Sequence, residues 1–226
     1  MLVSLMIFLV PLLFFVFTHF RNVPVKAKLV VHKAIQMKHL ASEQISLEKR
    51  YNNSYVNNVF KDNILLGMSY MAQKINKKED IDWKKIEKPM NYKFILPPDK
   101  TFAFHNDILE EYRDSVVKTT NADFNYREGF RSDGYLTGDG VCHLASLIYW
   151  VARNAGLNAY APTRHDFAVI PEINRQFGVS IYKGPGQSNS NEMQNLYVTN
   201  NKGKPLVFNF SYENGVLRLS IEEVML

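Results

Sequence analysis

The sequence has a single cysteine, Cys142, among its 226 residues. One thiol excludes an intramolecular disulfide, and no cluster of cysteine and histidine has the spacing of a zinc site. We therefore expect neither a metal nor a cofactor. A lone cysteine is either a small buried hydrophobic residue or a reactive thiol, so its role has to be read from the residues around it.

The chain also lacks a lysine- and arginine-rich run with interleaved aromatic residues, and it has no nucleic-acid motif. Charges of both signs are mixed along the chain, and the net charge of +5 gives a pI of about 9.1. This excess suits an anionic partner, such as lipid or an anionic polymer, and equally a solvated face without a partner. We expect no nucleic-acid partner.

No charged residue interrupts Leu2–Phe17, no Lys or Arg precedes it, and no small-x-small cleavage site follows it. With Thr18, His19 and Phe20 the segment approaches the width of a membrane. We therefore expect residues 1–22 to be a membrane anchor or an uncleaved signal. Because the basic residues all follow the apolar run, the positive-inside rule taken alone predicts a cytoplasmic domain.

The rest of the chain has a helical pattern first and a strand pattern later. Apolar residues recur at helical spacing between residues 25 and 80, so we expect a helical linker or extension over 23–62 and the main domain over 63–226. The expected class is α+β, with a helical N-terminal part and a central helix packed on an antiparallel sheet. A helix is also expected at 108–117, and strands are expected at 101–104, 159–161, 165–170, 179–182, 196–199, 206–212 and 216–222.

The central helix begins at the cysteine. A tight Gly-Asp-Gly turn at 138–140 precedes Cys142, and Gly156 is suited to end the helix. We expect Asp139 or a neighbour to cap the first turn. The helix dipole and free N–H groups there favour a thiolate, and the N–H groups of Cys142 and His143 could stabilise an oxyanion.

A nucleophilic thiol also needs a base, and His165 is the best candidate among six histidines because it begins a predicted strand after the helix. His105 is a distant second candidate, and His143 is adjacent to the cysteine. Asn195 is the preferred residue to orient the imidazole, although it also suits a turn. A histidine beside an apolar strand is often structural, so both interpretations of His165 stay open here.

Several short motifs follow one another from Asn63 to the end of the chain. The most specific is Gly138-Asp-Gly-Val-Cys-His-Leu-Ala-Ser146, which resembles Gly-Gly-Gly-Val-Cys-Gln-Val-Ser-Thr of the VanW-like domain family of bacterial cell-envelope proteins. Leu96–Asn106 resembles that family's Pro-Gly-Glu-x-Phe-Ser-Phe-Asn, and Arg164-His165 resembles its Arg-His turn. Asn195–Asn201 resembles its Asp-Leu-x-Phe-x-Asn-Asn.

The resemblance implies a membrane-anchored, extracytoplasmic protein that acts on peptidoglycan stem peptides, most closely by L,D-transpeptidation. It implies Cys142 as the acyl-enzyme nucleophile and His165 as the base. The residues expected to contact substrate are His143, Gly140, Arg164 and Asp139. Departures from the family pattern at His143, Asp139 and Asn195 leave the third catalytic residue open.

Two other functions stay open at this point. A cysteine amidase or peptidase of the cell wall would use the same residues, with water in place of an amine acceptor. A non-catalytic envelope module that binds glycan or a partner protein would instead keep Cys142 buried and inert.

Overall fold

The computed structural model describes residues 36–134, 137–166, 169–186 and 189–225, all within one compact unit. The anchor predicted at residues 1–22 lies outside these ranges. Among the described helices, none combines the length and the apolar character needed to cross a membrane. The elements are β1 (Gln36–Ser46), α1 (Ser54–Met71), α2 (Trp83–Ile86), β2 (Met90–Leu96), β3 (Thr101–Ala103), β4 (Val116–Lys118), α3 (Val141–Asn154), β5 (Asn158–Tyr160), α4 (Asn189–Met193), β6 (Tyr197–Thr199), β7 (Leu206–Glu213) and β8 (Val216–Met225), with short 3₁₀ turns between some of them.

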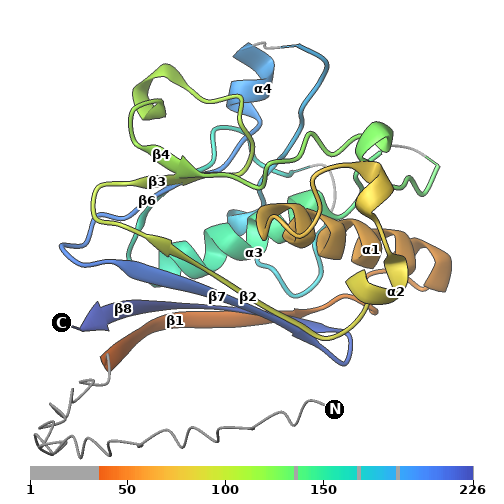
Figure 1. Ribbon diagram of the computed structural model, residues 1–226, viewed down its shortest axis with the longest axis horizontal. Helices are drawn as coiled ribbons and strands as arrows, with labels where there is room; N and C mark the ends of the chain where they lie inside the picture. Colours follow the sequence, from red (N-terminus) through yellow and green to blue (C-terminus); the bar gives the residue numbers. More distant parts are fainter. Residues whose placement is uncertain (1–35, 135–136, 167–168, 187–188, 226) are drawn as a thin grey trace, which may run out of the picture. The chain divides into compact units, whose positions relative to one another are not determined.

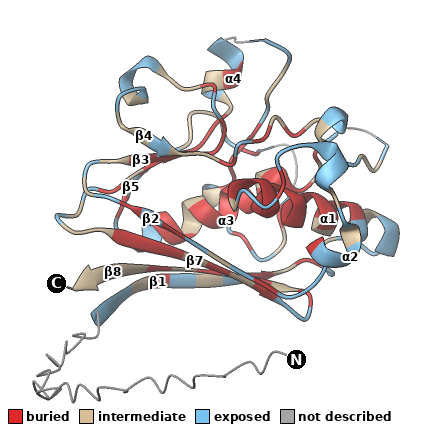
Figure 2. Cartoon of the chain, in the orientation of Figure 1, coloured by how far each residue is buried: buried red, intermediate tan, exposed pale blue. Residues whose placement is uncertain are grey.

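The described strands form two four-stranded sheets, and the α+β class is confirmed. The first sheet has the order β1-β8-β7-β2 and is antiparallel throughout. The second has the order β4-β3-β6-β5, in which only the short β3–β4 pair is parallel. Helices α1 and α3 lie over one face of the first sheet (Figure 1). Figure 2 shows that both helices are largely buried, so they form the centre of the core.

The predicted helical segment over 23–62 is wrong for Gln36–Ser46, which forms strand β1. This strand pairs with β8 along its length, from Gln36 opposite Met225 to Ser46 opposite Val216. The edge of β8 offers backbone hydrogen-bond partners along the strand. Such tertiary pairing outweighs the weak helical preference that the spacing of apolar residues in this segment indicates. The boundary placed at Asn63 falls inside α1, within the same compact unit.

Helix α1 confirms the second half of the predicted helical region. Asn53 caps its first turn, and its side-chain oxygen accepts hydrogen bonds from the N–H groups of Tyr55 and Val56 at 3.0 and 3.4 Å. The β7–β8 hairpin is also confirmed. Asn214 and Gly215, with φ of 51° and 73°, give the left-handed pair that a type I′ turn requires.

Other predicted elements differ from the structure. Strand β2 was not anticipated, and the helix expected at 108–117 is replaced by a short 3₁₀ turn followed by β4. The segments 165–170 and 179–182 form no regular strand in their described parts. A single bridge between Arg164 and Val179 joins them instead. These two segments lie against the cysteine and form part of the candidate site.

Candidate functional site

The turn before α3 is fixed by two glycines with left-handed backbone. Gly138 has φ of 87° and Gly140 has φ of 103°. A Cβ at Gly138 would lie 2.8 Å from the carbonyl oxygen of Phe124, and one at Gly140 would lie 2.7 Å from that of Phe60. Both positions therefore need glycine to bring the start of α3 against the neighbouring backbone. This close packing places Cys142 in the first helical turn.

The helix was expected to be capped by Asp139 or a neighbour, and the cap is the neighbour. Gly140 occupies the capping position without a side-chain hydrogen bond, and the Asp139 carboxylate accepts from the N–H of Asp133 at 3.1 Å. The N–H of His143 donates to the Gly140 carbonyl at 3.0 Å, so it is already engaged and does not serve as the predicted oxyanion donor. The helix therefore begins at a glycine turn and has no side-chain cap.

Cys142 is half-buried and lines a cavity of about 270 Å³. The Ile181 N–H donates to its sulfur at 3.4 Å, and the sulfur also lies 3.6 Å from the Ile181 carbonyl oxygen. The segment that follows Val179 thus holds the thiol from across the cavity. The residues lining the cavity include His143, His165, Gly140 and Asp139 of the predicted set.

Burial raises the pKa of the Cys142 thiol above its ordinary value. Three influences lower this pKa, namely the Ile181 N–H, the Arg50 guanidinium and the cysteine's own N–H, whereas Asp139 raises it further. The helix start therefore does not produce a preformed thiolate, contrary to the sequence expectation. A base is needed before the sulfur can act as a nucleophile.

His165 is buried at the same cavity. Its backbone N–H donates to the Gly178 carbonyl at 3.2 Å, beside the Arg164–Val179 bridge. The described residues of the predicted strand are not in a regular strand, but the bridge serves the same purpose because it fixes this backbone against the segment that contacts Cys142. Cys142 and His165 are thus brought to one cavity, as the sequence predicted.

His143 lies at the wall of this cavity and is buried. Its Nδ1 accepts a short hydrogen bond from Nη1 of Arg50. Burial, Arg50 and His165 together lower the pKa of His143 well below its ordinary value, so the ring is neutral at neutral pH. Arg50 comes from the loop between β1 and α1, and sequence analysis gave it no role.

Asp139 is the other titratable group of the predicted set at this cavity. Burial raises its pKa to about 6, against the hydrogen bond from Asp133 N–H and the charge of Arg50, which lower it. Its charge therefore changes close to neutral pH. Asp139 also lines the Cys142 cavity.

The structure does not bring Asn195 or Arg164 into the cavity. Asn195 is fully buried, and its amide donates to the carbonyls of His105 and Asp107 at 3.1 and 2.8 Å while accepting from the His105 N–H at 3.1 Å. It clamps two backbone segments, so the proposed role in orienting the imidazole of His165 is not supported. Arg164 is exposed and donates to the Gln176 carbonyl at 3.3 Å.

His105, the second candidate base, is also structural. Its Nε2 lies 3.0 Å from the Gln194 carbonyl oxygen, and its Nδ1 accepts from the Asp107 N–H at 3.3 Å. Burial lowers its pKa to about 4. Both ring nitrogens are therefore occupied by backbone.

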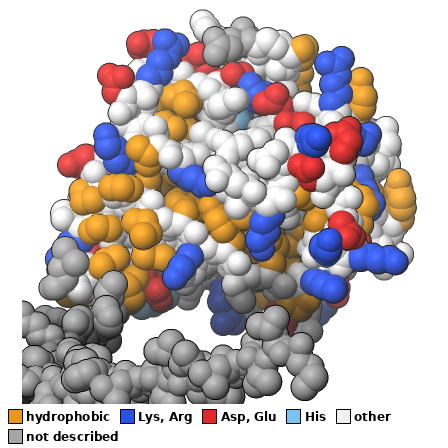
Figure 3. Space-filling model, viewed as in Figure 1, with side chains coloured by type: hydrophobic (Ala, Val, Ile, Leu, Met, Phe, Trp, Pro, Cys, Tyr) orange, Lys and Arg blue, Asp and Glu red, His pale blue; other side chains and the backbone are white. Residues whose placement is uncertain are grey.

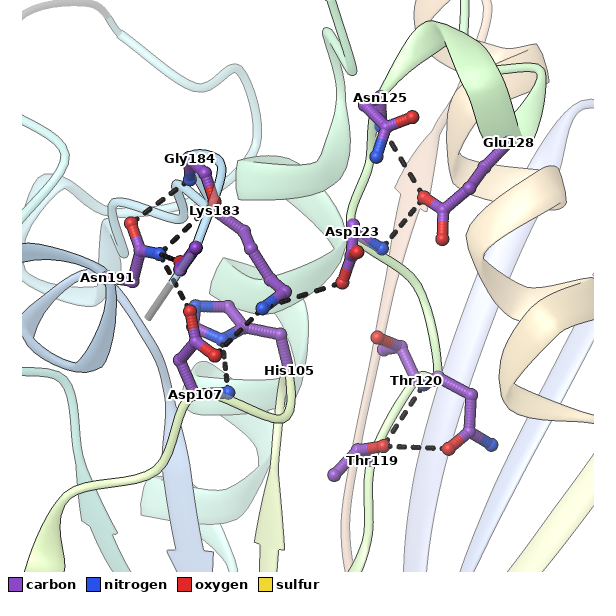
Figure 4. A network of polar contacts seen from close by, with 12 residues as sticks. His105, Asp107, Thr119, Thr120, Asp123, Asn125, Glu128, Lys183, Gly184 and Asn191 are labelled. Carbon is purple, nitrogen blue, oxygen red and sulfur yellow. Dashed lines mark hydrogen bonds and ion pairs between the residues drawn. The ribbon is translucent and has the colours of Figure 1, made fainter. Parts of the chain in front are cut away.

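A charged network around Lys183 and Asp123, two residues that line the cavity, is drawn in Figure 4. Lys183 Nζ lies 2.8 Å from an Asp107 oxygen and 3.5 Å from an Asp123 oxygen. Asn191 donates to the other Asp107 oxygen at 2.7 Å. Burial alone would raise the pKa of Asp107, but the hydrogen bonds from Lys183 and Asn191 lower it below its ordinary value. Lys183 and Asp107 are almost fully buried, whereas Asp123 is nearly half exposed.

This network joins the Cys142 cavity to a second one of about 650 Å³. The residues that line both are Asp123, Asn125, Lys183, Gly184 and Pro185. Glu128 holds the 123–125 segment by accepting from the Asp123 N–H at 2.8 Å. The two cavities therefore share one wall. On the face drawn in Figure 3, charges of both signs are interspersed around apolar side chains, without a single-sign patch.

Sequence reasoning missed Arg50, Lys183 and the Asp123–Phe124 segment, all of which line the Cys142 cavity. Arg50 lay in a presumed helical linker, and nothing local connects it with residue 143. Lys183 directly follows a predicted strand and precedes a glycine, which is a common place for a binding residue. That signal was available, although it does not identify Asp107 as the partner.

A family model described as "VanW like protein" matches residues 90–222, more than half of the chain. The comparison with curated proteins gave no match, and neither did the comparison with solved structures. The matched residues run from β2 to β8 and include α3 with its cysteine. The chain therefore belongs to the VanW-like family.

Proposed function

We propose that this protein is a cell-wall cysteine acyl-transferase with L,D-transpeptidase-like activity on peptidoglycan stem peptides. The observation that carries the proposal is the shared cavity, which Cys142 at the start of α3 and His165 both line. A second cavity, which shares Asp123 and Lys183 with the first, suits a peptide with charged groups better than a compact small molecule.

In the proposed reaction, His165 accepts the thiol proton and the Cys142 sulfur attacks a carbonyl carbon of the donor peptide. The amide C–N bond breaks, His165 returns the proton to the leaving amine, and a thioester stays on Cys142. An acceptor amine then attacks the thioester, loses a proton, and forms a new amide while the thiol is restored. The raised pKa of Cys142 makes the base essential at neutral pH.

The nucleophile is tested by incubating the full chain with tetrapeptide muropeptides and recording the intact protein mass. We expect a covalent adduct in the native protein and none in Cys142→Ala. Cys142→Ser is a matched variant that keeps the shape of the site and removes the sulfur. A folded native protein that forms no adduct and gives no product would contradict the proposal.

A cysteine hydrolase of the cell wall is the second candidate, because Cys142 and His165 would serve it equally and water can resolve the same thioester. Analysis of the released muropeptides separates the two activities. Crosslinked dimers indicate transfer, and trimmed monomers indicate hydrolysis.

We also propose that the domain is extracytoplasmic and tethered by the N-terminal apolar segment, in keeping with a peptidoglycan substrate. Protease treatment of intact spheroplasts checks this. Degradation of the domain without lysis agrees with the proposal, and protection until lysis contradicts it.

A further inference from the structure

Two buried donor atoms, in side chains that line the Cys142 cavity, have no partner within the described residues. These are Nε of Arg50 and Nε2 of His143. A buried N–H group without an acceptor is destabilising, so native proteins rarely retain one without a reason. Both residues line the cavity, and an acceptor placed there by a ligand would satisfy them.

The proton on His143 can be placed from its contacts. Arg50 Nη1 can only donate, so the Nδ1 atom that faces it must accept. The ring is neutral because its pKa is well below the ordinary value. The single ring proton is therefore on Nε2, and both unpartnered atoms are donors. A ligand at this wall must supply oxygen acceptors.

The charge of Arg50 narrows the choice of ligand. Its guanidinium lies over the Phe60 ring at 4.3 Å and near the Tyr51 ring at 5.4 Å. Within the described ranges, no carboxylate lies within ion-pair distance of it. The Asp139 carboxyl at the same cavity feels the charge of Arg50 but makes no ion pair with it. A half-buried guanidinium that makes no ion pair is well suited to an anionic ligand, because its planar donors match two oxygens.

The loop that carries Arg50 is rigidly attached. Asn57 of α1 is buried, donates to the carbonyls of Glu48 and Tyr51 at 2.8 Å each, and accepts from the Tyr51 N–H at 2.8 Å. These hydrogen bonds hold the backbone before and after Arg50. The guanidinium is therefore held in place before any ligand arrives, which reduces the entropy lost on binding.

We propose that Arg50 and His143 together form a carboxylate-binding subsite of the Cys142 cavity, which takes the free carboxylate at the end of a peptide. The identification of that peptide as the donor rests on the proposed function, whereas binding of a carboxylate does not. Arg50 lies outside residues 90–222, so the segment before the family match completes the site.

The first test follows binding by NMR of the full chain, with N-acetylalanine as the probe and N-acetylalaninamide as its uncharged match. We expect the acid to shift the Arg50 Nε–H resonance and the amide to leave it unchanged. Long-range ¹H–¹⁵N spectra should place the His143 proton on Nε2. Equal binding of acid and amide, or a proton on Nδ1, would overturn the proposal.

The second test compares the affinity for N-acetylalanine of variants that each lose one positive charge. Arg50→Gln should weaken N-acetylalanine at least about tenfold, the loss expected for one charge-assisted hydrogen bond. Arg153→Gln, exposed at the other end of α3, should stay within about twofold. His143→Gln should retain most binding, since its amide can accept from Arg50 and still donate. Equal losses in Arg50→Gln and Arg153→Gln would refute the subsite.

Failure of the two proposals can be distinguished. Carboxylate binding that depends on Arg50, without any adduct on Cys142, supports the subsite and rejects acyl transfer. An adduct in both the native protein and Arg50→Gln, with unchanged affinity for the acid, supports the nucleophile and overturns the subsite. Thermal unfolding of each variant shows that it is folded before it is compared.

Discussion

At the scale of single residues, the site combines a protonated thiol with a neutral imidazole. Burial raises the pKa of Cys142 and lowers that of His143, so both groups are uncharged at neutral pH. Arg50 is a fixed cation whose charge favours the thiolate. The Cys142 thiol therefore has to lose its proton to a base, or to be shifted by a bound substrate, before it reacts. It is not held as a thiolate by a resting ion pair.

The pH dependence of alkylation tests this balance. Because the Cys142 pKa is raised, the thiol form dominates at neutral pH and reaction with iodoacetamide should increase about tenfold per pH unit well above neutrality. Arg50→Gln removes a cation that lowers this pKa, so its profile should shift to still higher pH. The midpoint of the rate–pH curve is measured, because it does not depend on how easily iodoacetamide reaches the sulfur. A plateau below neutral pH would show a resting thiolate.

At the scale of elements, the start of α3 depends on the backbone more than on side chains. Gly140 packs against the backbone of α1, and Asn63 of that helix donates to the carbonyls of Arg131 and Asp139 at 2.9 and 2.8 Å. The loop before the cysteine is thus fastened to α1 from two directions. A substitution at the contact between Gly140 and α1 should disturb the cavity without changing Cys142 or His165 themselves.

Gly140→Ala and Gly134→Ala separate backbone strain from steric overlap. Both glycines have left-handed φ, 103° and 118°, but an added Cβ lies 2.7 Å from the Phe60 carbonyl oxygen at Gly140 and meets nothing within 4 Å at Gly134. Strain alone costs about 1–3 kcal/mol. We expect Gly140→Ala to lose more stability than Gly134→Ala in urea unfolding. Equal losses would mean that the contact with α1 is unimportant.

The elements that the sequence predicted best are those with strong local signals. Helix α3 has apolar residues at helical spacing and is followed by Gly156, and the β7–β8 turn has Asn214-Gly215. Both signals come from residues that are neighbours in sequence, and both elements were located correctly. β1 and the Arg164–Val179 bridge depend on distant backbone, which no local pattern encodes. For the same reason Cys142 and His165 could be paired through motifs, whereas Arg50 could not.

At the scale of the whole molecule, the two ends of the described chain lie side by side in the first sheet, since β1 pairs with β8. β1 is therefore part of the core and not a tether. Ile45 is 1% exposed, whereas Met37 on the same strand is 39% exposed. The pair allows a direct measurement of how far this strand supports the fold.

Ile45→Ala should destabilise the protein by about 2–5 kcal/mol, because it leaves a cavity under the sheet. Met37→Ala should change stability by about 0.5 kcal/mol or less, as an exposed position does. Urea unfolding of the full chain measures both. Similar small effects would indicate that β1 frays from the sheet and that the family-matched segment is stable without it.

The β1–β8 pairing also sets an order of events when the protein is made. The ribosome releases β1 long before β8, so the first strand has no partner until the last one emerges. Arg50 follows β1 by only a few residues, and its side chain contacts His143 of α3. The strand that leads to Arg50 is therefore paired only after α3 and the other residues that line the Cys142 cavity have been synthesised.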